Sequence, residues 1–246
     1  MKINDEGLII GQKKYGEDAL IINIFSKSNG PIMGLTKISK KNNKALLLDN
    51  VLFNWKSRIS DGLGYLNFEI INNYYSINEP YILNLIKVSI SEVCLKLIPL
   101  KDSNSHIYIN IIQILELFKK KKLNNLEYAK YFIIWELDFI ANLGYEVDFT
   151  KCSVSGVKDN LVYLSPKSGN VVSREVGEPW KEKLLNIPAF IINKESNFKK
   201  EDIINGLLVT EFFFNRIIKS IFDNRKSKKL IFKKQLIDFI DRVKGL

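Results

Sequence analysis

The chain has 246 residues, of which 46% are hydrophobic, and a formal net charge of +10. A chain of this length can bury a core without covalent staples, and its two cysteines exclude both a disulfide framework and a four-thiolate zinc site. The positive charge favours a polyanionic partner such as nucleic acid, although a composition rich in Ile, Asn and Lys produces the same charge without selection for binding.

The N-terminal residues carry acids where an export signal needs a basic start and an apolar run. No apolar run reaches the ~20 residues that span a bilayer. We therefore expect a cytoplasmic protein that is not inserted in a membrane.

Short apolar runs separated by turn residues fill the N-terminal part of the chain, from Glu6 to about Ile71. Such runs are typical of strands, and five short strands in ~65 residues favour a small barrel. The predicted strands are 8–10, 19–25, 31–36, 51–59 and 65–71.

Helical periodicity begins after Pro80. The first helix is predicted to end before Pro99, the second to begin at Ser103 or Ser105, and the third to end with Gly144 as its C′ residue. The predicted helices are 82–97, 105–119, 126–143, 201–222 and 227–243, and a hairpin of strands 161–164 and 170–173 interrupts them.

A predicted helix in the C-terminal half ends in Leu143-Gly144-Tyr145 and is followed by Asp148 and Cys152. The N-terminal half contains Glu6-Gly7-Leu8-Ile9-Ile10, Tyr15-Gly16-Glu17, the strand Leu20 to Phe25, and Gly30. These local segments, in this order along the chain, resemble the RecO family of recombination mediators.

The resemblance covers nearly the whole chain and implies an α+β fold. An OB-fold β-barrel is expected in residues 1–79, and a mainly helical domain in 80–246 with a hairpin inserted at about 145–198. The family also implies a nucleoid-associated repair protein that binds single- and double-stranded DNA and anneals strands coated with the single-strand-binding protein SSB. It would help to load RecA together with RecR, and RecF is a possible further partner.

The hairpin departs from the pattern of many family members, which place two Cys-x-x-Cys pairs there for zinc. Cys152 remains, but Ser155 takes the second position, and the second pair falls at Ser173 and Val176. His106 is the only histidine and lies in a predicted helix. We therefore expect no metal and no cofactor, and a hairpin region that is held by packing.

The first candidate DNA-binding surface is the basic edge of the barrel. Alternation along 51–59 places Phe53 and Trp55 on one face with Val51, as core residues, and the cations on the other face. The predicted DNA-binding residues are Lys37, Lys40, Lys41, Lys44, Lys56 and Arg58. The alternative reading is a solvated lysine loop.

The second candidate surface is C-terminal, because residues 198–246 carry 12 Lys or Arg against 6 Asp or Glu. The resemblance implies further DNA contact or docking of the acidic, apolar SSB tail at this surface. The predicted partner-binding residues are Arg216, Lys219, Arg225, Lys226 and Lys228, and Lys229 belongs to the same basic surface. Ordinary surface charge on a core helix is the alternative.

Catalytic motifs are absent from the sequence, which has no P-loop, nucleophile elbow or Cys-His pair. Glu136 and Asp138 are better explained as the solvated face of the third helix. We expect a binding protein rather than an enzyme. An RNA-binding or ribosome-associated OB-fold protein is the alternative function that the charge and the strand pattern permit.

Overall fold

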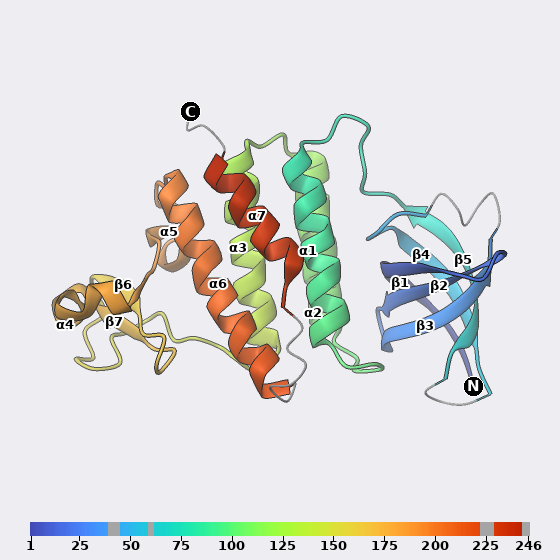
Figure 1. Cartoon of the computed structure of the whole chain (residues 1–246), viewed down its shortest axis with the longest axis horizontal. Coiled ribbons are helices and arrows are strands. Elements are labelled where there is room, and N and C mark those ends of the chain that lie inside the picture. Colours follow the sequence, from blue (N-terminus) through green and yellow to red (C-terminus); the bar gives the residue numbers. More distant parts are fainter. Residues whose placement is uncertain (39–44, 59–61, 222–228, 243–246) are drawn as a thin grey trace. The chain divides into compact units, whose positions relative to one another are not determined.

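The computed structural model describes residues 1–38, 45–58, 62–221 and 229–242, which form two compact units. The first unit, Met1–Lys122, holds a β-barrel and two helices, and the second, Leu123–Leu246, holds three long helices and a small sheet (Figure 1). The predicted α+β class is confirmed. The first compact unit includes the first two helices together with the barrel. The domain boundary expected between residues 79 and 80 stays a prediction.

All five predicted barrel strands are present. They close in the order β1-β2-β3-β5-β4, the five-stranded arrangement of an OB-fold, and β1 also pairs with β4. Among these described strand pairs, β3 and β5 alone run parallel. Compared with the predicted strands, β1 is far longer and β4 ends three residues earlier. The strands are β1 (Lys2–Tyr15), β2 (Ala19–Ser26), β3 (Gly30–Lys37), β4 (Asn50–Lys56) and β5 (Gly64–Asn72).

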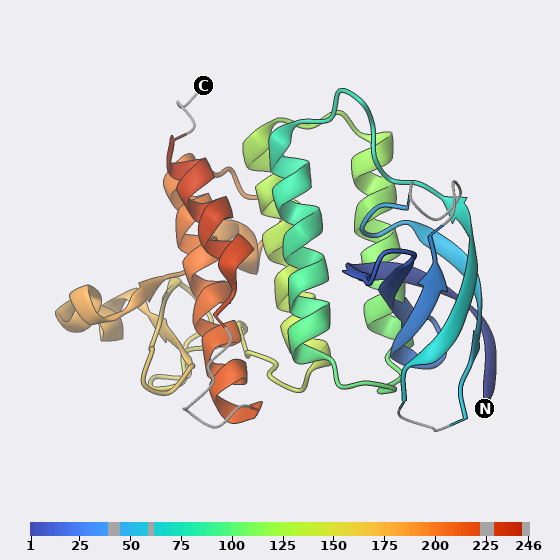
Figure 2. The same ribbon diagram turned by 45° about the vertical axis from the view of Figure 1, so that its right-hand side comes forward.

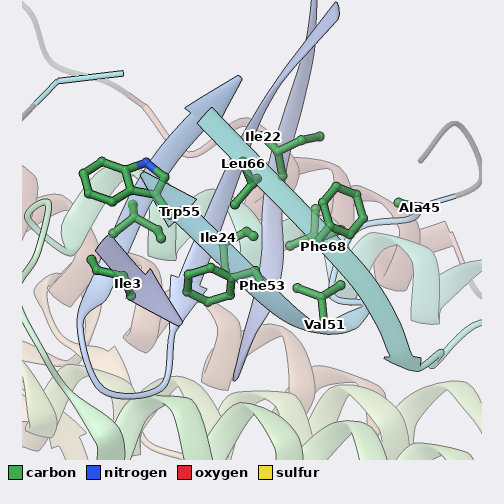
Figure 3. Packing of buried hydrophobic residues seen from close by; sticks show 11 residues of the cluster. Ile3, Ile22, Ile24, Ala45, Val51, Phe53, Trp55, Leu66 and Phe68 are labelled. Carbon is green, nitrogen blue, oxygen red and sulfur yellow. The ribbon is translucent and has the colours of Figure 1, made fainter. Parts of the chain in front are cut away.

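Alternate side chains of β2, β4 and β5 fill the barrel interior together with Ile3 and Ile9 of β1 and Ile32 of β3 (Figure 3). Val51, Phe53 and Trp55 of β4 all point inward, as their alternation predicts. The Trp55 indole N–H donates to the Met33 carbonyl at 2.9 Å, so the one polar atom of this ring has a partner inside the core. The opposite face of β4 is therefore left to solvent.

Helices α1 (Tyr81–Leu97) and α2 (Ser105–Lys120) lie side by side in the first unit (Figures 1 and 2). Pro80 precedes α1, and α1 ends before Pro99, as predicted. The N-cap of α2 is Asn104, whose side chain accepts from the Ile107 N–H, and neither predicted serine has that role.

The barrel and α2 share a polar contact. The Tyr108 hydroxyl donates to Glu6 at 3.2 Å and to Asn50 at 3.1 Å, and its ring packs edge-on against Phe25. A backbone bond from Lys101 to the Pro31 carbonyl ties the loop before α2 to β3. Helices and barrel therefore form one packed unit.

The second unit is built on α3 (Asn125–Asn142), α6 (Lys200–Ile221) and α7 (Ile231–Arg242). A capping box of Asn124 and Glu127 starts α3, and Gly144, with φ of 85°, follows its C-cap as predicted. The last helix begins later than predicted, since residues 229 and 230 are not helical.

The predicted hairpin is present as β6 (Leu161–Leu164) and β7 (Val171–Ser173). A two-residue strand, β8 (Leu185–Asn186), pairs with β6 and completes a three-stranded sheet. Three short helical segments that the sequence does not predict lie around β8 in the chain. They are α4 (Arg174–Gly177), the 3₁₀ segment η2 (Glu178–Lys183) and α5 (Ala189–Ile192).

Candidate nucleic-acid interface

A row of outward side chains crosses four strands of the barrel at one level. Lys2 pairs with Lys56 between β1 and β4, Lys56 pairs with Tyr65 between β4 and β5, and Tyr65 pairs with Leu35 between β5 and β3. Residues directly opposite on neighbouring strands project from the same face. Tyr65 is 74% exposed. The row therefore presents two ammonium groups beside an open aromatic ring.

Two grooves adjoin this row. A groove of about 970 Å³ runs over β1, β3, β4 and β5, and both Tyr65 and Lys37 line it. A second groove, of about 600 Å³, is lined by Lys56, Arg58 and Tyr65. Three of the predicted DNA-binding residues, Lys37, Lys56 and Arg58, thus lie around one exposed tyrosine. This arrangement of cations and an aromatic ring suits a single strand of nucleic acid.

The remaining predicted residues of the basic edge are Lys40, Lys41 and Lys44, which lie outside the described residues. Arg225, Lys226 and Lys228 of the C-terminal surface also lie outside them. Their placement stays a prediction.

The far end of the larger groove is acidic. Asp5 accepts from Ser26 and from the Ser28 N–H, and although burial opposes ionisation, these bonds lower the pKa of its carboxyl group. The Asn50 amide donates to Glu6 at 2.7 Å and lowers the pKa of that carboxyl group as well. Both groups therefore remain charged at neutral pH, and although Lys27 pairs with Glu6 at 3.4 Å, this end is less favourable for phosphates than the lysine row.

Arg216 on α6 is engaged within the second unit. Its Nη1 donates to the Ser168 carbonyl at 2.9 Å, in the turn between β6 and β7. The same guanidinium lies against Gly169, where a Cβ atom would come within 2.4 Å of Nη1. Arg216 therefore anchors the hairpin to α6, in addition to any contact with a ligand. Lys219, one turn further along α6, is exposed.

A groove of about 520 Å³ lies between α6 and α7. Leu230 and the exposed Ile231 give it an apolar floor, and Lys229 and Lys234 line it together with Glu211 and Asp238. Of these positions, only Lys229 belongs to the predicted basic residues of the C-terminal surface. The groove is nevertheless on the predicted C-terminal surface.

The prediction that Glu136 lies on a solvated face is wrong. Glu136 on α3 is fully buried, and its Oε2 accepts from Lys233 on α7 and from the Thr210 hydroxyl on α6, the latter at 2.7 Å. Asp138, two residues later, is exposed as predicted. The buried carboxylate finds its partner 97 residues away in sequence, and no local pattern reveals that partner.

The hairpin region retains one thiol, Cys152, of the four that the resemblance places there. Burial opposes ionisation of the Cys152 thiol, but N–H and hydroxyl groups of Ser155 and backbone N–H groups of Ser173 and Val154 lower its pKa to about 6. Ser155 and Ser173 stand where the resemblance places thiolates, and in the described part of the chain no three His, Cys, Asp or Glu side chains gather. These residues do not fit tetrahedral zinc.

The hairpin region is held by packing and backbone bonds instead. Cys152 donates its N–H to the Val157 carbonyl at 2.7 Å, and Ser153 bonds Val171 of β7 through both its N–H and its hydroxyl. Leu161, Leu164 and Val171 are buried. The turn at Cys152 is therefore held to β7 by hydrogen bonds of Ser153.

Tyr65 and Lys2 are the residues of this candidate site that the sequence prediction lacks. The signal for Tyr65 is present, because Leu66 and Phe68 alternate as inward residues and leave Tyr65 and Asn67 on the outer face. Alternation along β4 predicts Lys56 as outward, whereas the aromatic group beside it lies on β5.

Comparison with known proteins identifies the family of the chain. The family model "Recombination protein O N terminal" matches residues 1–74, and "Recombination protein O C terminal" matches 81–220. The DNA repair protein RecO of Rickettsia typhi is 33% identical over 99% of this chain and 100% of its own length. That of Wolbachia pipientis wMel is 31% identical over 89% of this chain and 92% of its own length.

In the described residues, no helix is both long and apolar enough to cross a bilayer. The two family models together span most of the chain, and the relatives align with it nearly from end to end. The chain therefore belongs to the RecO family, and its role lies in DNA repair and recombination.

Proposed function

We propose that this protein binds single- and double-stranded DNA through the outer face of its barrel and anneals complementary strands without catalysing a reaction. The observation that carries the proposal is the row of Lys2, Lys56 and Tyr65, which places two cations beside an exposed ring, with Arg58 in the adjoining groove. Cations follow the phosphates of a strand and an aromatic ring stacks its bases. Two neutralised strands can then meet without ATP.

The direct test is a fluorescence assay of strand annealing by the full chain, with bare strands and with strands coated by SSB. We expect acceleration over the spontaneous rate in both cases. An annealing rate equal to the spontaneous rate would overturn the proposal. Preferential binding of structured RNA would instead favour the RNA-binding alternative, and magnesium-dependent cleavage or joining would indicate an enzyme.

The groove between α6 and α7 supports docking of the SSB tail. An acidic, apolar peptide needs an apolar floor and cations. Leu230 and Ile231 supply the floor, and Lys229 and Lys234 supply the cations. Lys219 lies on α6, the helix that forms one wall of the groove. RecR is proposed as the further partner in loading RecA at the nucleoid, and RecF as an additional one.

Binding of a labelled SSB tail peptide tests the docking site. Replacement of Ile231, which is 59% exposed, by Asp removes the apolar floor and repels an acidic peptide, and the acid suits the N-terminal end of α7. The matched control is Ile192→Asp on α5, also exposed. Equal affinity of the two variants would place the tail elsewhere.

A further inference from the structure

Three asparagines form a ladder on the outer face of the barrel. Asn4 of β1 pairs with Asn54 of β4, and Asn54 pairs with Asn67 of β5. The Asn54 amide donates to the Asn4 side-chain oxygen. Neighbouring strands lie about 4.8 Å apart, so three amides stand in a line across the sheet. All three line the larger groove.

The ladder lies between two rows of opposite charge. The row of Lys2, Lys56 and Tyr65 lies two residues from the ladder along each strand in one direction. The row of Glu6, Leu52 and Glu69 lies two residues from the ladder in the other direction. Positions two residues apart on a strand are separated by about 7 Å. Across β1, β4 and β5 the outer face therefore changes from cationic to amide to acidic in steps of that size, while Lys37 of β3 lines the same groove.

This gradient assigns different parts of a nucleotide to different rows. Phosphates are attracted by the lysine row and are less favoured at the acidic row, where hydrogen bonds keep the Glu6 carboxylate charged and Lys27 pairs with it at 3.4 Å. A strand that lies with its backbone over Lys2 and Lys56 therefore turns its bases toward the ladder. Tyr65, on the lysine row, is placed to stack on a base or sugar.

The ladder has unused hydrogen-bonding capacity of the kind that bases need. Each amide carries two N–H donors and an acceptor oxygen, and only one bond within the ladder uses them. Asn67 is exposed, and no side-chain hydrogen bond of it is seen to any residue that the structure describes. Unpaired bases expose mixed donors and acceptors on their Watson–Crick edges, whereas phosphates offer acceptors alone.

We infer that Asn4, Asn54 and Asn67 hydrogen-bond the exposed edges of unpaired bases, so that this face distinguishes single-stranded from duplex DNA. The inference rests on the proposed DNA binding and adds to it the part of the ligand that is read. In a duplex the Watson–Crick edges are occupied, and only the lysine row keeps its partner. Once two strands have paired, their base edges no longer bond the asparagines, and the duplex is released from the ladder.

The test uses the full chain and two labelled probes of equal length, an oligothymidine and an oligonucleotide of abasic residues. Asn54→Val/Asn67→Val removes two amides and favours the strand, since β-branched residues suit this conformation. We expect about tenfold weaker binding of oligothymidine, from the loss of roughly two hydrogen bonds, and unchanged binding of the abasic probe. The salt dependence should not change, because no cation is removed.

Two controls keep the result specific. Asn78→Ala removes an exposed asparagine from the turn before α1 and should leave both affinities unchanged. Asn54→Val/Asn67→Gln keeps one amide and should bind oligothymidine more tightly than the variant with two valines. An equal loss for both probes, or no loss for either, would overturn the inference. Failure of the unsubstituted protein to bind either probe at low salt would instead overturn the proposed DNA binding itself.

Discussion

Lys233 and Glu136 form an ion pair between α7 and α3 in which both side chains are almost completely buried. Burial raises the pKa of Glu136 and lowers that of Lys233, while their mutual attraction opposes both shifts. The Thr210 hydroxyl on α6 bonds the same carboxylate. One polar cluster thus joins the three long helices of the second unit.

Removal of one partner of this pair should destabilise the protein strongly. Lys233→Met leaves a buried carboxylate without its counter-charge, and we expect a loss of about 3–5 kcal/mol in the free energy of unfolding. Lys233→Met/Glu136→Leu removes both charges and should recover most of that loss. Urea denaturation of the two variants measures this, and an equally unstable double variant would contradict it.

Cys152 should titrate near neutral pH, unlike Cys94. The pKa of Cys152 is lowered to about 6, whereas complete burial raises that of Cys94. An ultraviolet titration of thiolate absorbance should show a midpoint at about pH 6 that is lost in Cys152→Ala and kept in Cys94→Ala. A single transition at alkaline pH would contradict the hydrogen bonding at Cys152.

The same shift has a consequence for stability. The unfolded thiol has a pKa of about 8.5, so the folded state favours the thiolate. Its stabilising contribution is complete above that pH and is lost as the pH falls toward about 6. The stability difference between the protein and Cys152→Ala should therefore shrink as the pH falls over this window.

Tyr65→Ala should weaken binding of single-stranded DNA by roughly 1–3 kcal/mol, the range for loss of base stacking on an aromatic ring. Because Tyr65 is 74% exposed, the fold should not change. Tyr65→Phe keeps the ring and should bind nearly as well. Fluorescence anisotropy with oligothymidine separates the variants, and equal affinities for Ala and Phe would exclude stacking at this position.

Lys56→Glu/Arg58→Glu should weaken DNA binding in a manner that depends on salt. Each lost phosphate contact on a single strand lowers the slope of log affinity against log salt by about 0.7, so a change of roughly 1.4 is expected. Lys13→Glu/Lys14→Glu on β1 is the control of equal charge. Reversal of Lys40 and Lys41 should also lower the slope if the predicted loop contacts phosphates.

Gly30→Ala should be far more damaging than Gly16→Ala. Both glycines have φ between 60° and 70°, but a Cβ atom at Gly30 would lie 2.2 Å from the Asp102 carbonyl oxygen, whereas Gly16 has open space. Gly16→Ala should cost about 1–2 kcal/mol from backbone strain alone. Thermal unfolding compares the two, and similar midpoints would show that the loop before α2 moves away readily.

The barrel was predictable from sequence because its signal is local. Alternation in β4 identified Phe53 and Trp55 as core and Lys56 as outward, and turn residues marked each strand end. The strand β8 has only two residues, which is too short for a periodic signal. Its pairing with β6 depends on the sheet that is already formed.

The site was less predictable, because it depends on register. Lys2, Lys56 and Tyr65 are distant in sequence, and only the pairing of β1, β4 and β5 brings them into one row. The asparagine ladder follows from the same register. Glu136 was misplaced for a related reason, since its burial is compensated by Lys233 from a helix near the other end of the chain.

Because of the bonds between barrel and helices in the first unit, the segment matched by the N-terminal family model is smaller than the compact structural unit. The N-terminal family model ends at residue 74, but Tyr108 of α2 bonds Glu6 and Asn50, and Lys101 bonds Pro31. A barrel transplanted without α1 and α2 would carry Phe25 and these polar groups uncovered. An engineered barrel should therefore extend to Lys122, the end of the first compact unit, and not stop at residue 74.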